Sequence, residues 1–113
     1  MRIAIPVAQG RLATHFGHCE EFALIDVADG EDGRVVSTEL SEAPPHQPGL
    51  LPRWLREQGA DLIIAGGMGR RAQMLFAESG IEVVTGAPSG EPESVAAEYL
   101  RGSLETGENL CDH

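Results

Sequence analysis

A proline-rich segment at residues 43–49 constrains the fold more than any other feature of the sequence. Pro44, Pro45 and Pro48 remove backbone donors and fix φ, so this segment can be neither a helix nor a central strand. The pattern of apolar residues differs on its two sides. The segment therefore divides the chain into two parts that must be interpreted separately.

The first part contains three β-rich runs, at residues 2–7, 22–27 and 34–40. The third run alternates in the manner of a strand with one wet face. A short acidic, glycine-containing turn at residues 29–33 joins the second run to the third. Three successive strands with so tight a turn predict an antiparallel meander.

The second part alternates between helical and strand patterns. Its expected elements are a helix at 50–58, a strand at 61–65, a helix at 70–79, a strand at 81–84 and a helix at 91–100. Alternating strands and helices indicate βαβ units, so the whole chain is predicted to be α/β, with a five-stranded mixed sheet and helices on its faces. The length of 113 residues and the apolar content of 42% fit one domain with a packed core.

All four histidines and both cysteines fall in three places that are predicted to be loops or tail. They are His15, His18 and Cys19 in one loop, His46 in the proline-rich segment, and Cys111 and His113 at the C-terminus. Imidazole nitrogen and thiolate sulfur are the ligands that zinc, iron and iron–sulfur centres prefer. The alternative is a set of incidental loop residues, but their complete segregation favours a metal or cluster site.

A glycine-rich turn follows the apolar strand at 61–65. It comprises Gly66, Gly67, Met68, Gly69 and Arg70. Such a turn before a helix presents backbone N–H groups and a positive helix end to an anion. The pattern matches neither the P-loop nor the dinucleotide fingerprint. A tight structural turn and an anion contact both remain open, and Met68 either fills the core or covers a ligand.

The charge balance excludes several classes of partner. Eighteen acidic residues against eight basic ones give a net charge of −10, which repels nucleic acid and anionic membrane surfaces. The N-terminus enters a strand-like run with no signal-peptide pattern, so a cytoplasmic location is expected. No nucleophile–base–acid arrangement is visible in the sequence, and we expect a protein that is not an enzyme.

Several motifs give the chain a resemblance to a known family. They are Ile3-Ala4-Ile5-Pro6-Val7, His15-Phe16-Gly17, Pro44-Pro45-His46, Gly59-Ala60-Asp61, Ile64-Ala65-Gly66-Gly67-Met68-Gly69 and Gly80-Ile81-Glu82-Val83. With these, the chain resembles the dinitrogenase iron–molybdenum cofactor biosynthesis family, the NifX/NifB-like small proteins. The resemblance implies one such domain at residues 1–102, followed by a tail at 103–113 that carries Cys-x-His.

The resemblance also implies a ribonuclease-H-like fold and a role with metal clusters. Members of the family bind or carry iron–molybdenum cofactor precursors or other iron–sulfur or mixed-metal clusters. His18, Cys19, Cys111 and His113 are extra relative to many members, so the family's ligand set does not transfer as a whole. The radical-SAM cysteine motif of the large NifB enzymes is absent, and cluster-building chemistry is not expected.

The leading hypothesis is a carrier of a transition metal, iron or zinc, or of an iron–sulfur or iron–molybdenum-type cluster. Its partners would be proteins that donate or accept metalloclusters, and ligands could also come from two copies in a homo-oligomer. Two alternatives stay open: a zinc-stabilised module that binds another protein, and a redox pair formed by Cys19 and Cys111.

Overall fold

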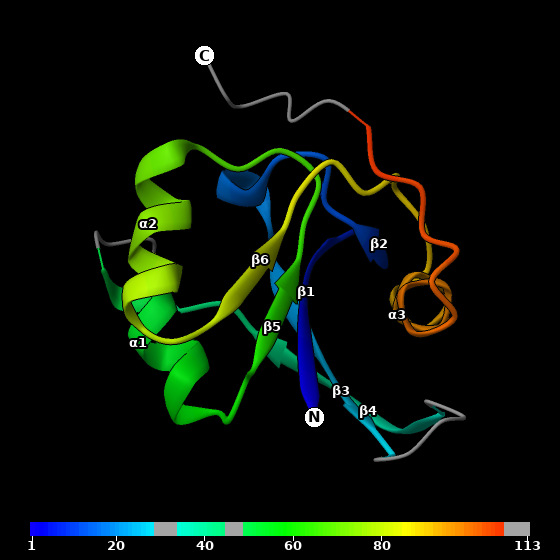
Figure 1. The fold of residues 1–113 in the computed structure, drawn as a ribbon. Coiled ribbons are helices and arrows are strands. Elements are labelled where there is room, and N and C mark those ends of the chain that lie inside the picture. The colour runs from blue at the N-terminus through cyan, green and yellow to red at the C-terminus, as the bar shows by residue number, and fades with distance from the viewer. Residues whose placement is uncertain (29–33, 45–48, 108–113) are drawn as a thin grey trace.

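Strand β1, Arg2–Ala8, forms the centre of one mixed sheet (Figure 1). The computed structural model describes residues 1–28, 34–44 and 49–107. Within these ranges the main strand order is β4-β3-β1-β5-β6. Ile3 and Ile5 of β1 have no exposed surface, because strands flank β1 on both sides and helices cover both faces of the sheet.

The meander expected in the first part of the chain is confirmed. β1 pairs antiparallel with β3, Glu21–Val27, and β3 pairs antiparallel with β4, Val35–Glu42. A register shift between Asp26 and Val27 marks a β-bulge near the start of β4.

The βαβ units expected in the second part are also confirmed. β5, Leu62–Ile64, pairs parallel with β1, and β6, Glu82–Val84, pairs parallel with β5. All three residues of β5 are buried, as the continuous apolar run predicts for a strand covered on both faces.

The sheet has six strands in the described ranges, and the predicted count of five was therefore one too low. The additional strand is β2, Arg11–Leu12, which pairs antiparallel with the end of β1. Gln9 and Gly10 have φ values of 55° and 79°, and positive φ at both central residues is what a two-residue hairpin turn requires. The Gln-Gly pair is a weak turn signal, so the sequence predicts only a loop in this segment.

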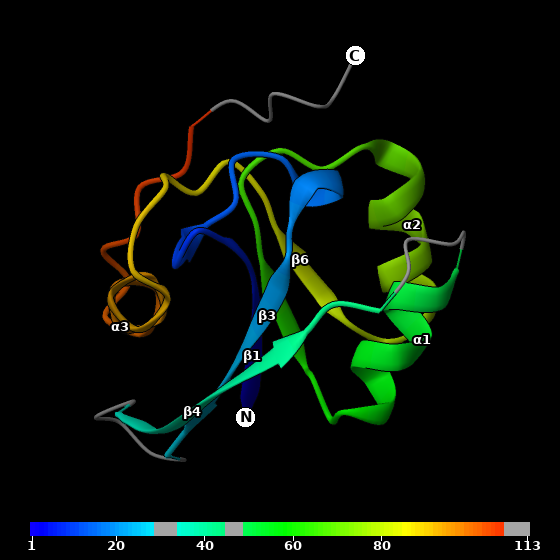
Figure 2. The same ribbon diagram turned by 180° about the vertical axis from the view of Figure 1, so that it is seen from behind.

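Two helices cover one face of the sheet and one helix covers the other (Figures 1 and 2). They are α1, Leu50–Glu57, and α2, Arg70–Glu78, on one side, and α3, Pro92–Leu100, on the other. Each layer buries its own apolar cluster. Phe22 of β3 and Phe76 of α2 belong to one, and Ile3 of β1 and Val95 of α3 belong to the other. None of the helices in the described ranges has the length and apolar character needed to cross a membrane.

The edge strand β4 was expected to expose one face to solvent and bury the other, but most of its residues are exposed. Val36 is 67% exposed and Leu40 is 58% exposed, so apolar side chains of β4 face solvent. The helix layers cover the centre of the sheet, and β4 lies at its margin beyond most of that cover.

A network around Arg2 ties the start of β1 to its neighbours. The Arg2 guanidinium donates to both carboxylate oxygens of Asp26, with Nε–Oδ1 at 2.8 Å and Nη2–Oδ2 at 3.0 Å. Its Nη1 donates to the carbonyl oxygen of Gln58 at 2.9 Å, and the Ser37 hydroxyl donates to Asp26 Oδ2 at 3.1 Å. The hydrogen bonds from Arg2 hold the pKa of Asp26 below its usual value.

This ion pair predicts a pH-dependent contribution to stability. Because the pKa of Asp26 is lower in the folded state, its contribution is present above the unfolded value of 3.8 and is lost as the pH falls further. An Asp26→Asn variant should lose about 0.2–1 kcal/mol of unfolding free energy at pH 7, as is usual for a surface pair, and less at pH 3. Urea unfolding at both pH values measures the difference, with Glu82→Gln on β6 as the control. An equal loss at both pH values would contradict the assignment.

Candidate functional site

Loops from separate parts of the sequence meet at the sheet edge where β1, β5 and β6 end (Figure 1, top). These three strands are parallel, so their carboxyl ends share one edge. β3 begins and β4 ends at the same edge, because Glu21 pairs with Glu42. The described segments at this edge are residues 9–20, 43–44, 65–69 and 85–91.

The histidine-containing loop and the glycine-rich turn are joined through their backbones. Gly67 N donates to Thr14 O at 2.7 Å, and Phe16 N donates to Gly67 O at 2.8 Å. His15 and Gly67 thereby form a parallel β-bridge. Two segments that the sequence analysis singled out separately are therefore adjacent.

Gly66 makes this approach sterically feasible. A Cβ atom at Gly66 would lie 2.6 Å from the carbonyl oxygen of Thr14 and 3.0 Å from that of Ala13. Real side chains do not tolerate such contacts with backbone atoms, so any other residue would push the two loops apart.

A hollow of about 230 Å³ opens between the loops, which we call the loop hollow. It is lined by Thr14, Gly66, Gly67, Gly86, Ala87, Pro88 and Ser89. Much of this lining is backbone or small side chains, which leaves peptide groups close to anything bound there. The volume suits a small inorganic group better than a large organic ligand.

Phe16 anchors the histidine-containing loop to the core. It lies in a short 3-10 helix, η1, Phe16–His18, with its ring centroid 5.5 Å from that of Phe76 and 6.2 Å from that of Phe22. The ring of Phe22 in turn lies 5.7 Å from that of Trp54 on α1. The loop is thus fixed to the helix layer by aromatic packing.

The three predicted ligands of this loop have different environments. His15 is half-buried directly before η1, beside the bridge to Gly67. The backbone of His18 ends η1, and its side chain lies outside the described part of the structure. Cys19 is 7% exposed and belongs to the core cluster under α1 and α2. Burial raises the pKa of the Cys19 thiol to about 11, which favours the neutral thiol at pH 7.

The residues of the glycine-rich turn also differ in their environments: some line the loop hollow, one lies in the core and one is exposed. Gly66 and Gly67 line the loop hollow, whereas the Met68 side chain is completely buried in the core. Met68 is therefore core filler, and the Gln73 side chain donates to its carbonyl oxygen at 2.9 Å. Gly69 precedes α2 without a side-chain cap, and Arg70 is exposed at the first position of that helix.

His46, Cys111 and His113 lie outside the described residues, but the segments that lead to them do not. Ala43 N donates to Glu20 O at 3.1 Å, so the proline-rich segment starts next to the histidine-containing loop. Gly107 N donates to Gly86 O at 2.7 Å, so the last described residue lies beside the loop hollow. Among the residues that the structure describes, no three His, Cys, Asp or Glu side chains are grouped closely enough to hold a metal ion.

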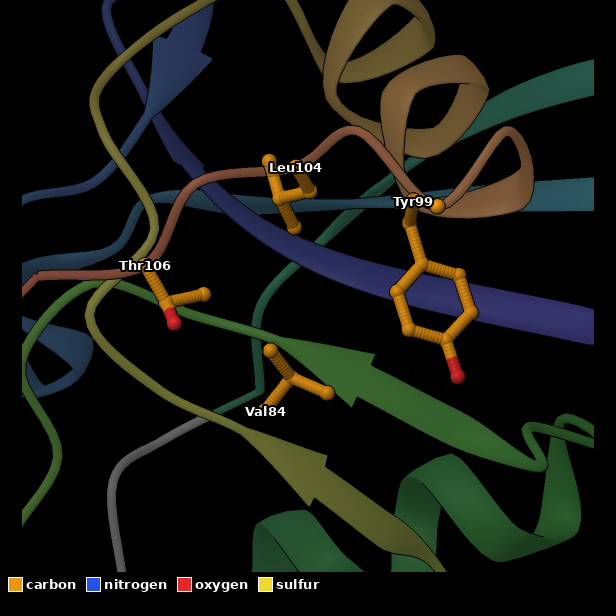
Figure 3. A pocket seen from close by; sticks show the side chains of 5 residues that line it. Val84, Tyr99, Leu104 and Thr106 are labelled. Carbon is orange, nitrogen blue, oxygen red and sulfur yellow. The ribbon is translucent and has the colours of Figure 1, made fainter.

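The segment after α3 packs beside β6 and borders a second, open hollow of about 280 Å³ (Figure 3). Val84, Tyr99, Leu104 and Thr106 surround it, and its lining is mainly apolar. Leu104 packs on the α3-side core. These contacts hold the first residues of the predicted tail against the sheet and direct the chain toward Gly86.

The loop at residues 85–91 contributes to the site and was not predicted from the sequence. Ser89 Oγ donates to Leu12 O at 3.0 Å, and Leu12 N donates to Gly90 O at 2.8 Å, which fixes this loop against β2. The one feature of the sequence that could have identified this loop is its position directly after a strand predicted to be parallel. The loop contains glycines, as the turn at 66–69 does, but it contains no histidine or cysteine and therefore no candidate metal ligand.

Residues 1–102 match the family described as dinitrogenase iron-molybdenum cofactor. The chain belongs to this family. Membership associates it with the binding or biosynthesis of a metal cofactor. An uncharacterized protein of Methanocaldococcus jannaschii is 29% identical to this family member over 107 residues, which is 93% of this chain and 90% of that protein.

Solved structures agree with the fold of this family member. The crystal structure of PH0822 has a TM-score of 0.84 and 34% sequence identity, and the match covers 96% of each chain. The apo form of the orange protein from Desulfovibrio gigas has a TM-score of 0.72 and 20% identity, over 96% of this chain and 93% of that chain. At that identity the second likeness shows the fold alone.

The contact at Gly66 predicts a large effect of a small substitution. Gly66→Ala should lower the unfolding free energy by about 2 kcal/mol or more, because its Cβ collides with backbone carbonyl oxygens. Gly17→Ala is the matched control: it lies in the same pair of loops, no atom lies within 4 Å of its Cβ position, and it should change stability by less than about 0.5 kcal/mol. Urea unfolding compares them, and equal effects would contradict the close approach.

Burial of Cys19 predicts slow thiol chemistry. In a Cys111→Ser background, Cys19 should react with a thiol reagent more than about tenfold more slowly in native protein than in urea. The same protein in denaturant is the control. Equal rates in the two conditions would show that the thiol is accessible in the native state.

Proposed function

We propose that the protein binds a metal–sulfur cluster, or a transition metal destined for one, and carries it between donor and acceptor proteins. The observation that carries this proposal is the meeting of segments at one sheet edge. Thr14 of the histidine-containing loop lines a glycine-rich hollow, Gly107 before the C-terminal residues bonds to Gly86 of its lining, and the proline-rich segment starts beside Glu20 of the histidine-containing loop. Membership in the dinitrogenase iron–molybdenum cofactor family supports the same reading.

Covalent reach supports a shared site. His46 follows the described Pro44 by two residues and Cys111 follows Gly107 by four. Only short stretches of chain therefore separate these two residues from the described part of the structure. Together with His15, His18 and His113, and without the core thiol of Cys19, they supply more than the four ligands that zinc or an iron–sulfur cluster needs.

The start of α2 supplies positive potential for an anionic cargo. The first N–H groups of a helix have no intrahelical acceptor, and Gly69 provides no side-chain cap. Arg70 and Arg71 add two of the eight basic residues of a chain whose net charge is −10. We propose that this positive end holds the anionic part of a cluster and that the role is not catalytic.

The sheet order also supports the fold class that the family resemblance implies. Leaving out the two-residue β2, three antiparallel strands are followed by two strands parallel to β1, with α1 and α2 on one face and α3 on the other. We propose a ribonuclease-H-like fold on this basis.

Anaerobic purification followed by metal analysis and reconstitution with ferrous iron and sulfide tests the carrier function. We expect a coloured species with near-stoichiometric metal and a visible spectrum that disappears on chelation. A His15→Ala, His18→Ala double variant should lose most of the metal. Arg70→Ala should weaken uptake of the anionic cluster, whereas the matched control Arg101→Ala, at the end of α3, should not.

Thermal unfolding after chelation separates a carrier from a zinc-stabilised module. A carrier should keep its melting temperature nearly unchanged without metal, because its two apolar clusters are complete without it. Collapse of the fold on chelation would instead favour the structural zinc site. A colourless protein that takes up neither iron nor zinc would overturn the proposal.

A further inference from the structure

Gly86 is the residue at which the segment after α3 meets the loop hollow. It lines that hollow, and its carbonyl oxygen accepts a hydrogen bond from Gly107 N at 2.7 Å. Its own N–H group donates to Gly66 O at 2.8 Å. One residue therefore joins the glycine-rich turn on one side to the last described residue of the chain on the other.

A positive φ angle accompanies this double contact. In an extended strand, the N–H and C=O groups of one residue point toward the same neighbouring strand. Gly86 directs the two groups to different segments, and its φ of 80° lies in the region that glycine adopts without strain. A residue with a side chain would be strained here even if the space around it were empty.

The space around Gly86 is filled, unlike the space around the other glycines with positive φ. A Cβ atom at Gly86 would collide with the carbonyl oxygen of Gly107 and would lie 3.0 Å from its carbonyl carbon. In the described ranges, the other glycines with positive φ have no atom within 4 Å of the same position; they are Gly10, Gly49, Gly59, Gly80 and Gly102. A turn alone therefore does not explain the need for glycine at position 86.

The segment that leads to Gly107 is anchored along its length. Ser103 N donates to Glu98 O at 2.9 Å, and Leu104 packs on the α3-side core. Leu104 and Thr106 also border the second hollow beside β6 (Figure 3). The hydrogen bond to Gly86 is the last anchor in the described chain, and six residues follow it in the sequence.

We infer that Gly86 is the positioning residue that brings Cys111 and His113 to the loop hollow, because it holds the chain just before them. Cys111 follows Gly107 by four residues and His113 follows it by six. The contact fixes the start of this short stretch at a residue that itself lines the hollow. Tethering ligands close to a site raises their effective concentration there, so the contact strengthens metal binding.

This inference rests on the proposed metal site and adds the contact that regulates it. Coupling between two binding events is reciprocal. If the contact between Gly86 and Gly107 favours metal binding, a bound metal must favour that contact by the same factor. The metal should therefore protect the segment at residues 103–107 from release.

Cobalt(II) titration tests the positioning role, with calorimetry for affinity and thiolate-to-cobalt absorption for the sulfur ligand. The absorption should appear in the unchanged protein and be lost in Cys111→Ser. Gly86→Ala should weaken cobalt binding at least about tenfold and lower this absorption, because its Cβ displaces Gly107. Gly80→Ala is the matched control, since its φ of 79° imposes similar strain without a collision, and it should change neither.

A background without the C-terminal ligands separates positioning from a direct effect on the hollow. In full-length Cys111→Ser, His113→Ala protein, Gly86→Ala should weaken cobalt binding no further, because the ligands that it positions are gone. An equal loss in both backgrounds would overturn the inference, and so would unchanged cobalt binding in Gly86→Ala alone. Gly107→Pro removes the donated N–H without altering position 86, and it should reproduce the loss if Gly86→Ala does not fold.

Proteolysis tests the contact without metal. A glutamate-specific protease should cleave after the exposed Glu105 mainly when the surrounding segment leaves its anchors. Gly86→Ala should speed the loss of residues 106–113 at least about fivefold by mass spectrometry, and Gly80→Ala should not. Cobalt should slow this loss in the unchanged protein. Failure of the unchanged protein to bind cobalt would overturn the proposed function, whereas equal cleavage rates in the two glycine variants would overturn the role of Gly86.

Discussion

The approach of Gly66 to the carbonyl oxygens of Ala13 and Thr14 holds the candidate site together. Without a side chain at this position, the ends of two parallel strands can bring their following loops into backbone contact. The bridge between His15 and Gly67 follows directly from that contact. The position of the histidine-containing loop relative to the start of α2 is therefore set by the main chain, which leaves side chains available for binding.

The candidate site combines loops packed on the core with two arginines at the start of α2. Phe16 and Met68 pack the two loops onto the core beneath them. Arg70 and Arg71 lie at the same edge of an otherwise acidic protein. An anionic cargo would meet a local positive region while the remaining surface repels other polyanions.

Periodicity predicted most of the fold because each apolar run corresponds to one element. The run at 61–65 became the buried strand β5, and Gly59 and Gly80, both with positive φ, lie just beyond helices α1 and α2. The short strand β2 was missed because two residues carry no period. The exposure of Val36 and Leu40 was missed because alternation cannot show where the helix layers stop covering a sheet.

The candidate site was predictable in outline and not in its details. Residue type identified His15 and the glycine-rich turn as candidates. It could not show that Met68 is a core residue whereas Gly67 lines the loop hollow. Thr14 and Ser89 were missed because their importance depends on which strand ends are neighbours. The burial of Cys19 depends on α1 and α2 packing over it, which local sequence does not encode.

The aromatic rings under the histidine-containing loop provide an optical signal from inside the molecule. Trp54 is the single tryptophan of the chain, and its ring contacts Phe22, which contacts Phe16 in η1. A rearrangement of η1 would change the surroundings of the indole through one intervening ring. The intrinsic fluorescence of the unlabelled protein can therefore report a change in the conformation of η1 in real time.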